Sequence, residues 1–211
     1  MSFKYSCFMS YRHCRNQLGK RIVSDLYNAL SGELELMTDK EVYLDRERLE
    51  GGYFYNEALA RALCESVCLI AVFTPTYFDR YHTYCAREYK AMEKLEAERL
   101  KLLQNPSNHV YGLIIPIVFR GENYLPPEIK NRRQYVKFDS FLLSDDEMSK
   151  HPRFAPEIRK IAEYIAARCQ AFDALSEDAC KNCSEFTLPT EEEIREWLEG
   201  ITGFKQSFPG R

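Results

Sequence analysis

Three short segments carry the residues best suited to chemistry in this chain of 211 residues. They are residues 8–12, 43–52 and 84–88. The first is typical of a strand that enters a polar loop, and the second of a strand followed by a charged loop that ends in glycine. The third is typical of a helix start that carries one carboxylate, Glu88. Each pattern is weak alone, so the inference depends on their order and spacing.

Glu88 is the residue best suited to act on a cationic group. On a helix it shares one face with Tyr84, Met92 and Leu95, because side chains three or four residues apart are neighbours. A carboxylate on a partly apolar face is less hydrated and interacts more strongly with a positive charge. The alternative is a solvated glutamate on a charged helix. We expect that solvated state for Glu93, Glu96 and Glu98.

The two loops supply groups that suit a nucleotide. Arg12 follows the first predicted strand, and its planar guanidinium can donate two hydrogen bonds to a pyrophosphate. Glu50 is a suitable acceptor for sugar hydroxyls. Gly51 and Gly52, in the same loop, allow positive backbone angles. The alternative is that Arg12 is a surface residue or a partner of Asp45, and that the glycines belong to an ordinary charged turn.

Strand and helix patterns alternate along the chain. Strands are predicted at residues 5–11, 42–45, 67–73, 113–119 and 135–138. Apolar stripes with helical spacing lie at residues 18–30, 55–63 and 158–169. Residues 84–104 are rich in good helix formers and predict a further helix. We expect Ser31 and Gly32 to end the first helix and residues 121–127 to form a loop. We expect Pro116 to lie on an edge strand or at a bulge, where a missing backbone donor is tolerated.

This alternation predicts an α/β fold with a five-stranded parallel sheet and helices on both faces, which is a flavodoxin-like layout. Ligands of such sheets bind beyond the carboxyl ends of the strands, at a switch point in strand order. We therefore expect chemistry in the loops after the first two strands and on the helix after the third. We expect this domain to span residues 1–172. Thr190 and Glu193 predict a capping box and a short helix in an extension over residues 173–211.

Composition argues against several classes of protein. The net charge of −3 provides no basic surface for phosphates, so we expect no nucleic-acid partner. The longest apolar runs, residues 67–73 and 113–119, are far shorter than the roughly 20 residues that span a bilayer. The first residues lack the pattern of a signal peptide. We therefore expect a cytoplasmic protein that has no membrane partner.

The cysteines predict neither a disulfide framework nor a metal site. Of the eight cysteines, Cys7, Cys64 and Cys68 lie in apolar segments, where free thiols act as small hydrophobic residues. We expect these three to be reduced. Cys180 and Cys183 form a lone CxxC pair without a second pair at zinc-ribbon spacing. We expect no metal there.

In their order, the three segments resemble a TIR domain, and the resemblance covers residues 4 to about 172. It implies that Glu88 is the catalytic glutamate of an enzyme that cleaves NAD+. It also implies that Glu50 lies near the ribose hydroxyls, in the loop usually called the BB loop. The other substrate contacts that it implies are Ser10, Tyr11, Arg12, His13, Asp45 and Tyr84.

The bond to be broken joins ribose to a positively charged pyridinium, which is already an excellent leaving group. One carboxylate beside the sugar can stabilise the oxocarbenium-like centre, whereas ordinary glycosidases use a pair. NAD+ is then the substrate, and no cofactor is expected. Tyr84 stands where many relatives carry tryptophan, and it offers a smaller aromatic face with a hydroxyl. Hydrolysis to ADP-ribose and cyclisation to a cyclic ADP-ribose isomer are both left open.

Two rival hypotheses belong beside this one. A TIR scaffold would bind other TIR domains through the BB loop without activity, although Glu88 weighs against it. An enzyme like the nucleoside deoxyribosyltransferases would also use a glutamate on N-glycosidic bonds, but it fits the spacing of Tyr84 and Glu88 less well. The resemblance further implies self-association of TIR subunits. By analogy, the small chain resembles stand-alone TIR proteins of anti-phage systems such as Thoeris, whose product activates a separate effector.

Overall fold

A computed structural model describes residues 3–13, 16–45, 55–79, 81–103, 112–142, 147–175, 179–180 and 182–201. Within these residues lies a five-stranded sheet whose paired strands are all parallel. The strands are β1 (Tyr5–Tyr11), β2 (Glu41–Leu44), β3 (Ser66–Phe73), β4 (Ile114–Val118) and β5 (Val136–Lys137). Their spatial order is β2-β1-β3-β4-β5. This order confirms the predicted α/β, flavodoxin-like topology.

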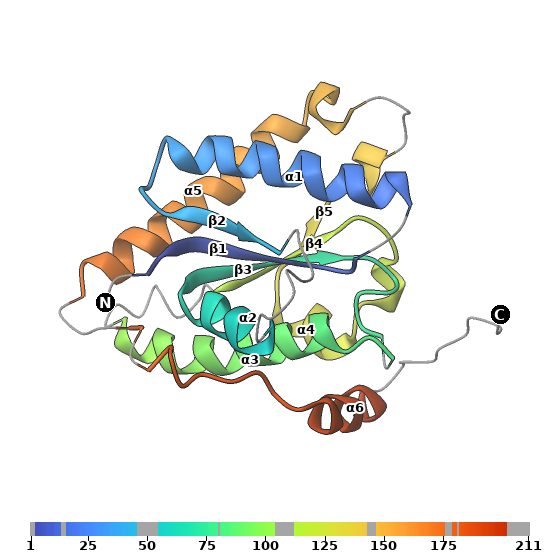
Figure 1. Cartoon of the computed structure of the whole chain (residues 1–211). Helices are drawn as coiled ribbons and strands as arrows, with labels where there is room; N and C mark the ends of the chain where they lie inside the picture. Colours follow the sequence, from blue (N-terminus) through green and yellow to red (C-terminus); the bar gives the residue numbers. More distant parts are fainter. Residues whose placement is uncertain are drawn as a thin grey trace.

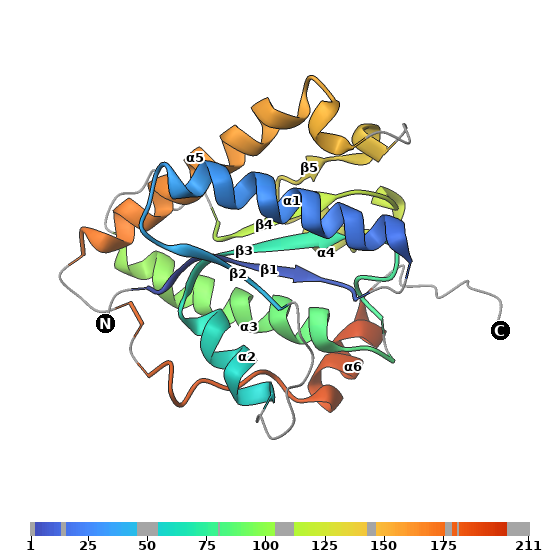
Figure 2. The ribbon, with the colours of Figure 1, turned by 45° about the horizontal axis from the view of Figure 1, so that its top comes forward.

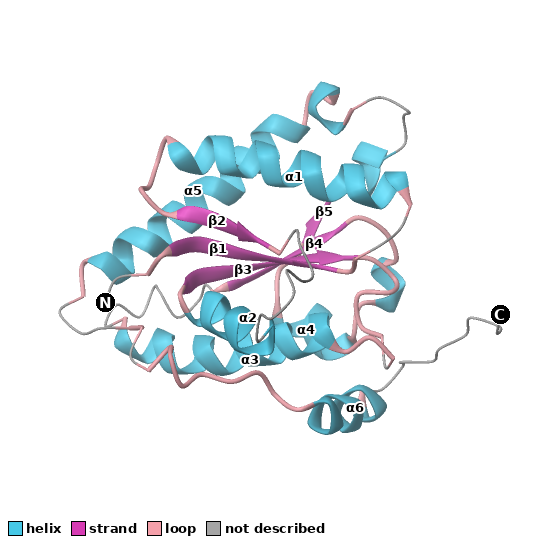
Figure 3. Ribbon diagram, in the orientation of Figure 1, coloured by secondary structure: helices cyan, strands magenta, loops and turns pink. Residues whose placement is uncertain are grey.

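Helices cover both faces of the sheet. The α-helices of the described residues are α1 (Gln17–Glu35), α2 (Tyr55–Cys64), α3 (Tyr84–Arg99), α4 (Pro127–Arg132), α5 (Phe154–Asp173) and α6 (Glu191–Gly200). The short 3-10 helices are Leu100–Leu102, Glu122–Tyr124, Asp139–Leu142 and Met148–Lys150. Figure 1 shows α1 and α5 on one face and α2, α3 and α4 on the other. Figure 3 shows the strands as a single layer between them, and α6 lies outside α3 (Figure 2).

The pattern of buried residues in each element explains where that element lies in the fold. All eight residues of β3 are buried, as expected for a central parallel strand covered on both faces. In α1 the buried residues Ile22, Leu26, Leu30 and Leu34 recur every four positions and face the core. None of the helices in the described part of the chain is both long enough and apolar enough to cross a membrane.

Two predicted helix boundaries are wrong. α1 continues through Ser31 and Gly32 to Glu35, because Leu34 extends the buried stripe and is only 1% exposed. A glycine in a helix costs about 1 kcal/mol relative to alanine, which this burial offsets. The predicted loop at 121–127 contains a 3-10 turn, and α4 begins at Pro127, where the fixed φ of proline suits the first helical turn.

Pro116 lies on an internal strand, not on the predicted edge strand. It is opposite Ala71 of β3, and β5 pairs with the other side of β4. The Val118 carbonyl accepts a hydrogen bond from the Phe138 amide, so alternate residues of β4 direct their backbone groups toward β5. The ladder with β5 begins only at Ile117, beyond Pro116. The missing donor of Pro116 therefore interrupts neither ladder.

The predicted C-terminal helix is present as α6. The Thr190 hydroxyl accepts from the Glu193 amide at 3.3 Å, and the Glu193 carboxylate accepts from the Thr190 amide at 2.7 Å. This reciprocal pair is the predicted capping box. Ile194 and Leu198 are buried on the inner face of the helix. Trp197 packs against Phe78, with ring centroids 5.4 Å apart.

The prediction that Cys64 is reduced is wrong. Cys64, at the end of α2, forms a disulfide with Cys183, 119 residues later in the chain. Their Cα atoms are 5.4 Å apart, which is within the range that a disulfide can bridge. The sequence pattern around Cys64 indicates burial but does not reveal which residue the fold brings beside it. Cys7 and Cys68 are free thiols, and burial raises the pKa of both.

Candidate active site

Glu88 lies near the start of α3 and is buried, with 6% of its surface exposed. Met92 and Leu95, on the same face of the helix, are 0% and 5% exposed. The prediction that Glu88 shares a partly apolar face is therefore confirmed. Tyr84, the first residue of α3, is half-buried, and the guanidinium of Arg87 lies 5.3 Å from its ring centroid.

Ser10 joins β1 directly to Glu88. It lies near the carboxyl end of β1 and is 1% exposed. Its hydroxyl donates to Glu88 Oε2 at 2.5 Å, and it lies 2.7 Å from the hydroxyl of Tyr77. The third predicted segment is thus held against the first by a buried hydrogen bond between side chains.

Tyr11, His13 and Asp45 connect the chain after β1 with the end of β2. The Tyr11 hydroxyl donates to the Asp45 carbonyl at 2.8 Å. The rings of Tyr11 and His13 are stacked, with centroids 4.6 Å apart. His13 Nε2 lies 3.9 Å from Asp45 Oδ2, within ion-pair distance when the imidazole is protonated. These contacts bring two predicted segments together at the carboxyl edge of the sheet.

Arg12 pairs with Asp79 and not with Asp45. The guanidinium lies 3.9 Å from Asp79 Oδ2, and both side chains are about one fifth exposed. Asp79 follows β3, so this ion pair connects the chain after β1 with the loop that leads to α3. The alternative in which Arg12 is a partner of Asp45 is wrong, because the guanidinium lies beside Asp79, while His13 lies beside Asp45.

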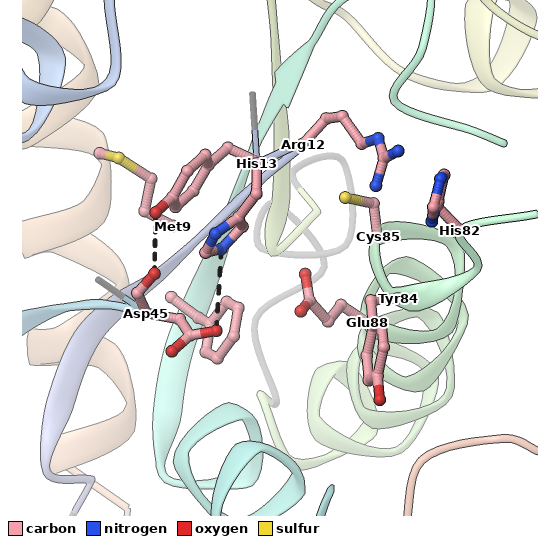
Figure 4. A pocket seen from close by; sticks show the side chains of 10 residues that line it. Met9, Arg12, His13, Asp45, His82, Tyr84, Cys85 and Glu88 are labelled. Atoms are coloured by element: carbon pink, nitrogen blue, oxygen red, sulfur yellow. Dashed lines mark hydrogen bonds and ion pairs between the residues drawn. The ribbon is translucent and has the colours of Figure 1, made fainter. Parts of the chain in front are cut away.

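A narrow cleft lies between these side chains. Six predicted site residues line it: Tyr11, Arg12, His13, Asp45, Tyr84 and Glu88. Figure 4 shows the Glu88 carboxylate directed from α3 into the cleft, with His13 and Asp45 on the opposite wall. The cleft has a volume of about 10 Å³, which is room for roughly one water molecule. Glu50 lies outside the described residues.

Sequence reasoning missed three residues of this region. His82 and Cys85 line the cleft beside Glu88, and Tyr77 supports Ser10 from behind. His82 and Cys85 lie within six positions of Glu88, so their closeness in sequence was an available signal. Tyr77 lies in the turn after β3, where the Tyr77 amide donates to the Thr74 carbonyl at 2.9 Å, and no periodic pattern includes it.

Glu96 is not the predicted solvated glutamate. It is 8% exposed, and its carboxylate accepts hydrogen bonds from Arg133 NH1 at 2.9 Å and NH2 at 2.5 Å. It also accepts from the amides of Leu113 and Ile114, next to β4. Burial, the largest single influence, lowers the pKa of Arg133, but the hydrogen bonds to Glu96 together with the nearby Tyr89, Glu96 and Glu93 raise that pKa above its ordinary value. The pair fixes the middle of α3 against β4.

The donor set of the cleft suits an anionic nucleotide that carries a cationic group. Arg12 offers a positive donor and His13 a ring nitrogen that can donate, while Glu88 and Asp45 offer carboxylates. Among the described residues, no group of three or more His, Cys, Asp or Glu side chains is arranged to hold a metal ion. The side chains that line the cleft can supply charge stabilisation, hydrogen bonding and stacking.

Comparison with known proteins gives one family match. The family model described as TIR domain matches residues 7–151, more than half of the chain. The matched range contains Ser10, Arg12, Asp45 and Glu88. A search among curated proteins gives no match to the chain.

Proposed function

Since this chain belongs to the TIR domain family, we propose that it is an enzyme that breaks the bond between nicotinamide and ribose in NAD+. The products are nicotinamide and either ADP-ribose or a cyclic ADP-ribose isomer. The observation that carries the proposal is the Glu88 carboxylate, which is buried on α3 and borders the cleft. Arg12, His13 and Asp45 line the same cleft.

Glu88 supplies the charge that the reaction needs. As the carbon–nitrogen bond breaks, its electron pair goes to the pyridinium nitrogen, and nicotinamide leaves as a neutral molecule. The ribose carbon becomes oxocarbenium-like, and a carboxylate beside it lowers the energy of that state. A low-dielectric setting strengthens this interaction, and the 6% exposure of Glu88 provides one. Water then adds and releases a proton, or a nitrogen of the adenine adds and closes a ring.

The remaining residues hold the substrate. We assign Arg12 to the pyrophosphate, because its guanidinium can donate two parallel hydrogen bonds to phosphate oxygens. Asp45 is an acceptor for ribose hydroxyls, and Glu50 is proposed for the same role on the resemblance alone. Tyr84 offers an aromatic face near the nicotinamide. NAD+ is a substrate in this scheme, and the scheme uses no cofactor.

The narrow cleft implies that substrate binding requires a rearrangement. A pocket for a small molecule usually encloses roughly 300–1,000 Å³, whereas this cleft has about 10 Å³. Three of the four side chains in the ion pairs of Arg12 with Asp79 and of His13 with Asp45, each at 3.9 Å, line this cleft, and we propose that these pairs rearrange when it opens. Contact with a second TIR subunit offsets the cost of opening, so we propose that self-association activates the enzyme.

The same narrowness favours a second candidate function. A TIR scaffold binds other TIR domains and needs no room for a dinucleotide beside Glu88. The buried hydrogen bond from Ser10 to Glu88 would then stabilise the packing of α3 on β1. This reading leaves unexplained why a carboxylate, an arginine and a histidine converge on one cleft at the carboxyl edge of the sheet.

The wider role follows by analogy with small TIR proteins of anti-phage systems. We propose that the nucleotide product is a signal that activates a separate effector, and that the protein acts in the cytoplasm, where NAD+ is abundant. Disulfides are uncommon in that compartment. The disulfide between Cys64 and Cys183 is therefore unusual for the proposed cytoplasmic location.

Product analysis tests the proposal. Purified protein is incubated with NAD+ over a range of concentrations and with a crowding agent, and products are identified by chromatography and mass spectrometry. The expected result is nicotinamide together with an equal amount of ADP-ribose or a cyclic isomer. No turnover at any concentration, for a folded protein, would favour the scaffold.

A further inference from the structure

Tyr77 is a fully buried tyrosine that is joined to Glu88 through one intermediate. Its side chain is 0% exposed and packs against the rings of Phe73 and Phe78. Its hydroxyl lies 2.7 Å from Ser10 Oγ, and Ser10 Oγ lies 2.5 Å from Glu88 Oε2. The chain of hydrogen bonds thus crosses three segments: the turn after β3, the end of β1 and the start of α3.

The number of protons available decides which group donates in each of these two hydrogen bonds. A serine hydroxyl has one proton, and an ionised carboxylate can only accept. Ser10 donates its proton to Glu88, so Tyr77 must donate to Ser10. Burial, followed by the nearby Cys85 and Glu88, raises the pKa of Tyr77 well above its ordinary value. The phenol therefore keeps its proton and remains a donor throughout the working pH range.

We propose that Tyr77 is a positioning residue that acts on the Glu88 carboxylate through Ser10. This inference rests on the proposed cleavage of NAD+. By donating to Ser10, Tyr77 holds the serine proton toward the carboxylate and prevents the serine from turning to the substrate or to water. A hydrogen bond to the charged form of a carboxylate favours that form, and consecutive hydrogen bonds strengthen one another. Tyr77 thereby keeps Glu88 ionised and in one orientation.

Tyr77 differs from the other polar groups around Glu88 because it is separated from the substrate. Among the described residues, the ionisable groups that line the cleft beside Glu88 are Tyr11 at the end of β1, Arg12 and His13 after it, Asp45 after β2, His82 before α3, and Tyr84 and Cys85 at the start of α3. Tyr77 lies behind Ser10 and does not line the cleft. Changing it should alter turnover and its pH dependence while leaving substrate binding intact.

The first test is Tyr77→Phe, which removes one oxygen and keeps the buried ring. We expect kcat to fall about tenfold, or roughly 1.4 kcal/mol of barrier, with KM within twofold of wild type. The acid limb of the kcat–pH profile should move to higher pH, because the charged form of Glu88 loses support. Tyr89→Phe is the matched control, since Tyr89 is 1% exposed and accepts from Arg133 instead. It should leave kcat and the profile unchanged.

A double-mutant cycle separates positioning from packing. In a Ser10→Ala background the hydrogen bonds between Tyr77 and Glu88 are already broken, so adding Tyr77→Phe should change kcat by less than about twofold. Independent effects of the two substitutions, with the full tenfold loss retained in that background, would show that Tyr77 does not act through Ser10. Ser10→Ala also leaves Tyr77 packed, so it reports on the chain even where Tyr77→Phe lowers stability.

A measurement without substrate distinguishes this inference from the proposed reaction. The carboxyl ¹³C resonance of Glu88, assigned by its absence in Glu88→Gln, is titrated in wild type, Tyr77→Phe and Ser10→Ala. Both variants should shift its midpoint to higher pH. If NAD+ is not cleaved but the midpoint shifts, the reaction is wrong and the hydrogen-bonded chain is supported. An unchanged midpoint in both folded variants overturns the inference, whatever the activity.

Discussion

Arg87, the residue before Glu88, donates a hydrogen bond from Nε to the backbone carbonyl of Pro189 at 2.7 Å. The two residues are 102 positions apart. Pro189 belongs to the segment 182–201, which also carries Cys183, bonded to Cys64, and Trp197, packed against Phe78. This C-terminal segment therefore holds the outer side of α3, while Ser10 and Glu96 hold its inner side.

Cys183→Ser should destabilise the protein. The disulfide closes a loop of about 120 residues and restricts the unfolded chain, so its loss should lower the free energy of unfolding by about 2–5 kcal/mol. Denaturant unfolding measures the difference. Cys180→Ser is the control, because Cys180 is a buried cysteine three positions before Cys183 that takes no part in the disulfide.

A reducing agent should lower the melting temperature of wild type but not of Cys183→Ser. Counting reactive thiols in denatured protein should give two more after reduction than before. If the reducing agent leaves the melting temperature of wild type unchanged, and the thiol counts before and after reduction are equal, the two cysteines are not bonded.

Glu96→Ala should cost about 1–3 kcal/mol of unfolding free energy, because it removes the carboxylate that accepts from Arg133 and from the amides of Leu113 and Ile114. Glu98→Ala, at an exposed position of the same helix, should change stability by less than about 0.5 kcal/mol. Thermal and denaturant unfolding compare the two variants. Equal stability of both would show that the Glu96 pair contributes nothing to holding α3.

Periodicity predicted the fold well because apolar residues at regular spacing report directly on burial. The strand β3 and the stripe from Ile22 to Leu30 follow this rule. The same signal cannot tell a solvated glutamate from one that meets a distant arginine, so Glu96 was misassigned. It also cannot pair Cys64 with Cys183, because that contact exists only after the chain has folded.

Much of the candidate site could be predicted because its residues lie at the ends of successive strands of a parallel sheet. Such ends meet at one edge, so the segments that contain Arg12, Asp45 and Glu88 come together. Side-chain pairing was not predictable, since it depends on loop geometry: Arg12 lies beside Asp79. The assignment of Glu50 stays a prediction, because that residue lies outside the described residues.

Arg12→Ala should raise KM for NAD+ about tenfold and change kcat little. A guanidinium that binds the pyrophosphate equally in the ground and transition states contributes uniform binding, which appears in KM. Steady-state kinetics over a wide range of NAD+ concentrations measures both constants. A variant with wild-type KM and kcat would remove Arg12 from the substrate site. Lys101→Ala is the control, at an exposed position in the 3-10 helix after α3.

Specific activity should rise with protein concentration if, as proposed, contact with a neighbouring subunit favours opening of the narrow cleft. Only the assembled fraction turns over in that case. Replacing Leu49, or Gly51 and Gly52, in the BB loop should lower both assembly and rate. Light scattering and rate measurements on the same dilution series test this. A constant specific activity with a monomer throughout would show that one chain carries a complete site.

Glu88→Gln tests the central claim most directly, because it keeps the shape of the side chain and removes its charge. Its matched control is Glu98→Gln, at an exposed position on the same helix. With folding verified by circular dichroism, the rate of nicotinamide release from NAD+ is measured for both variants and for wild type. The account predicts a fall of at least about a hundredfold for Glu88→Gln, or roughly 2.7 kcal/mol of barrier, and no change for Glu98→Gln. Turnover by folded Glu88→Gln within a few-fold of wild type would contradict it.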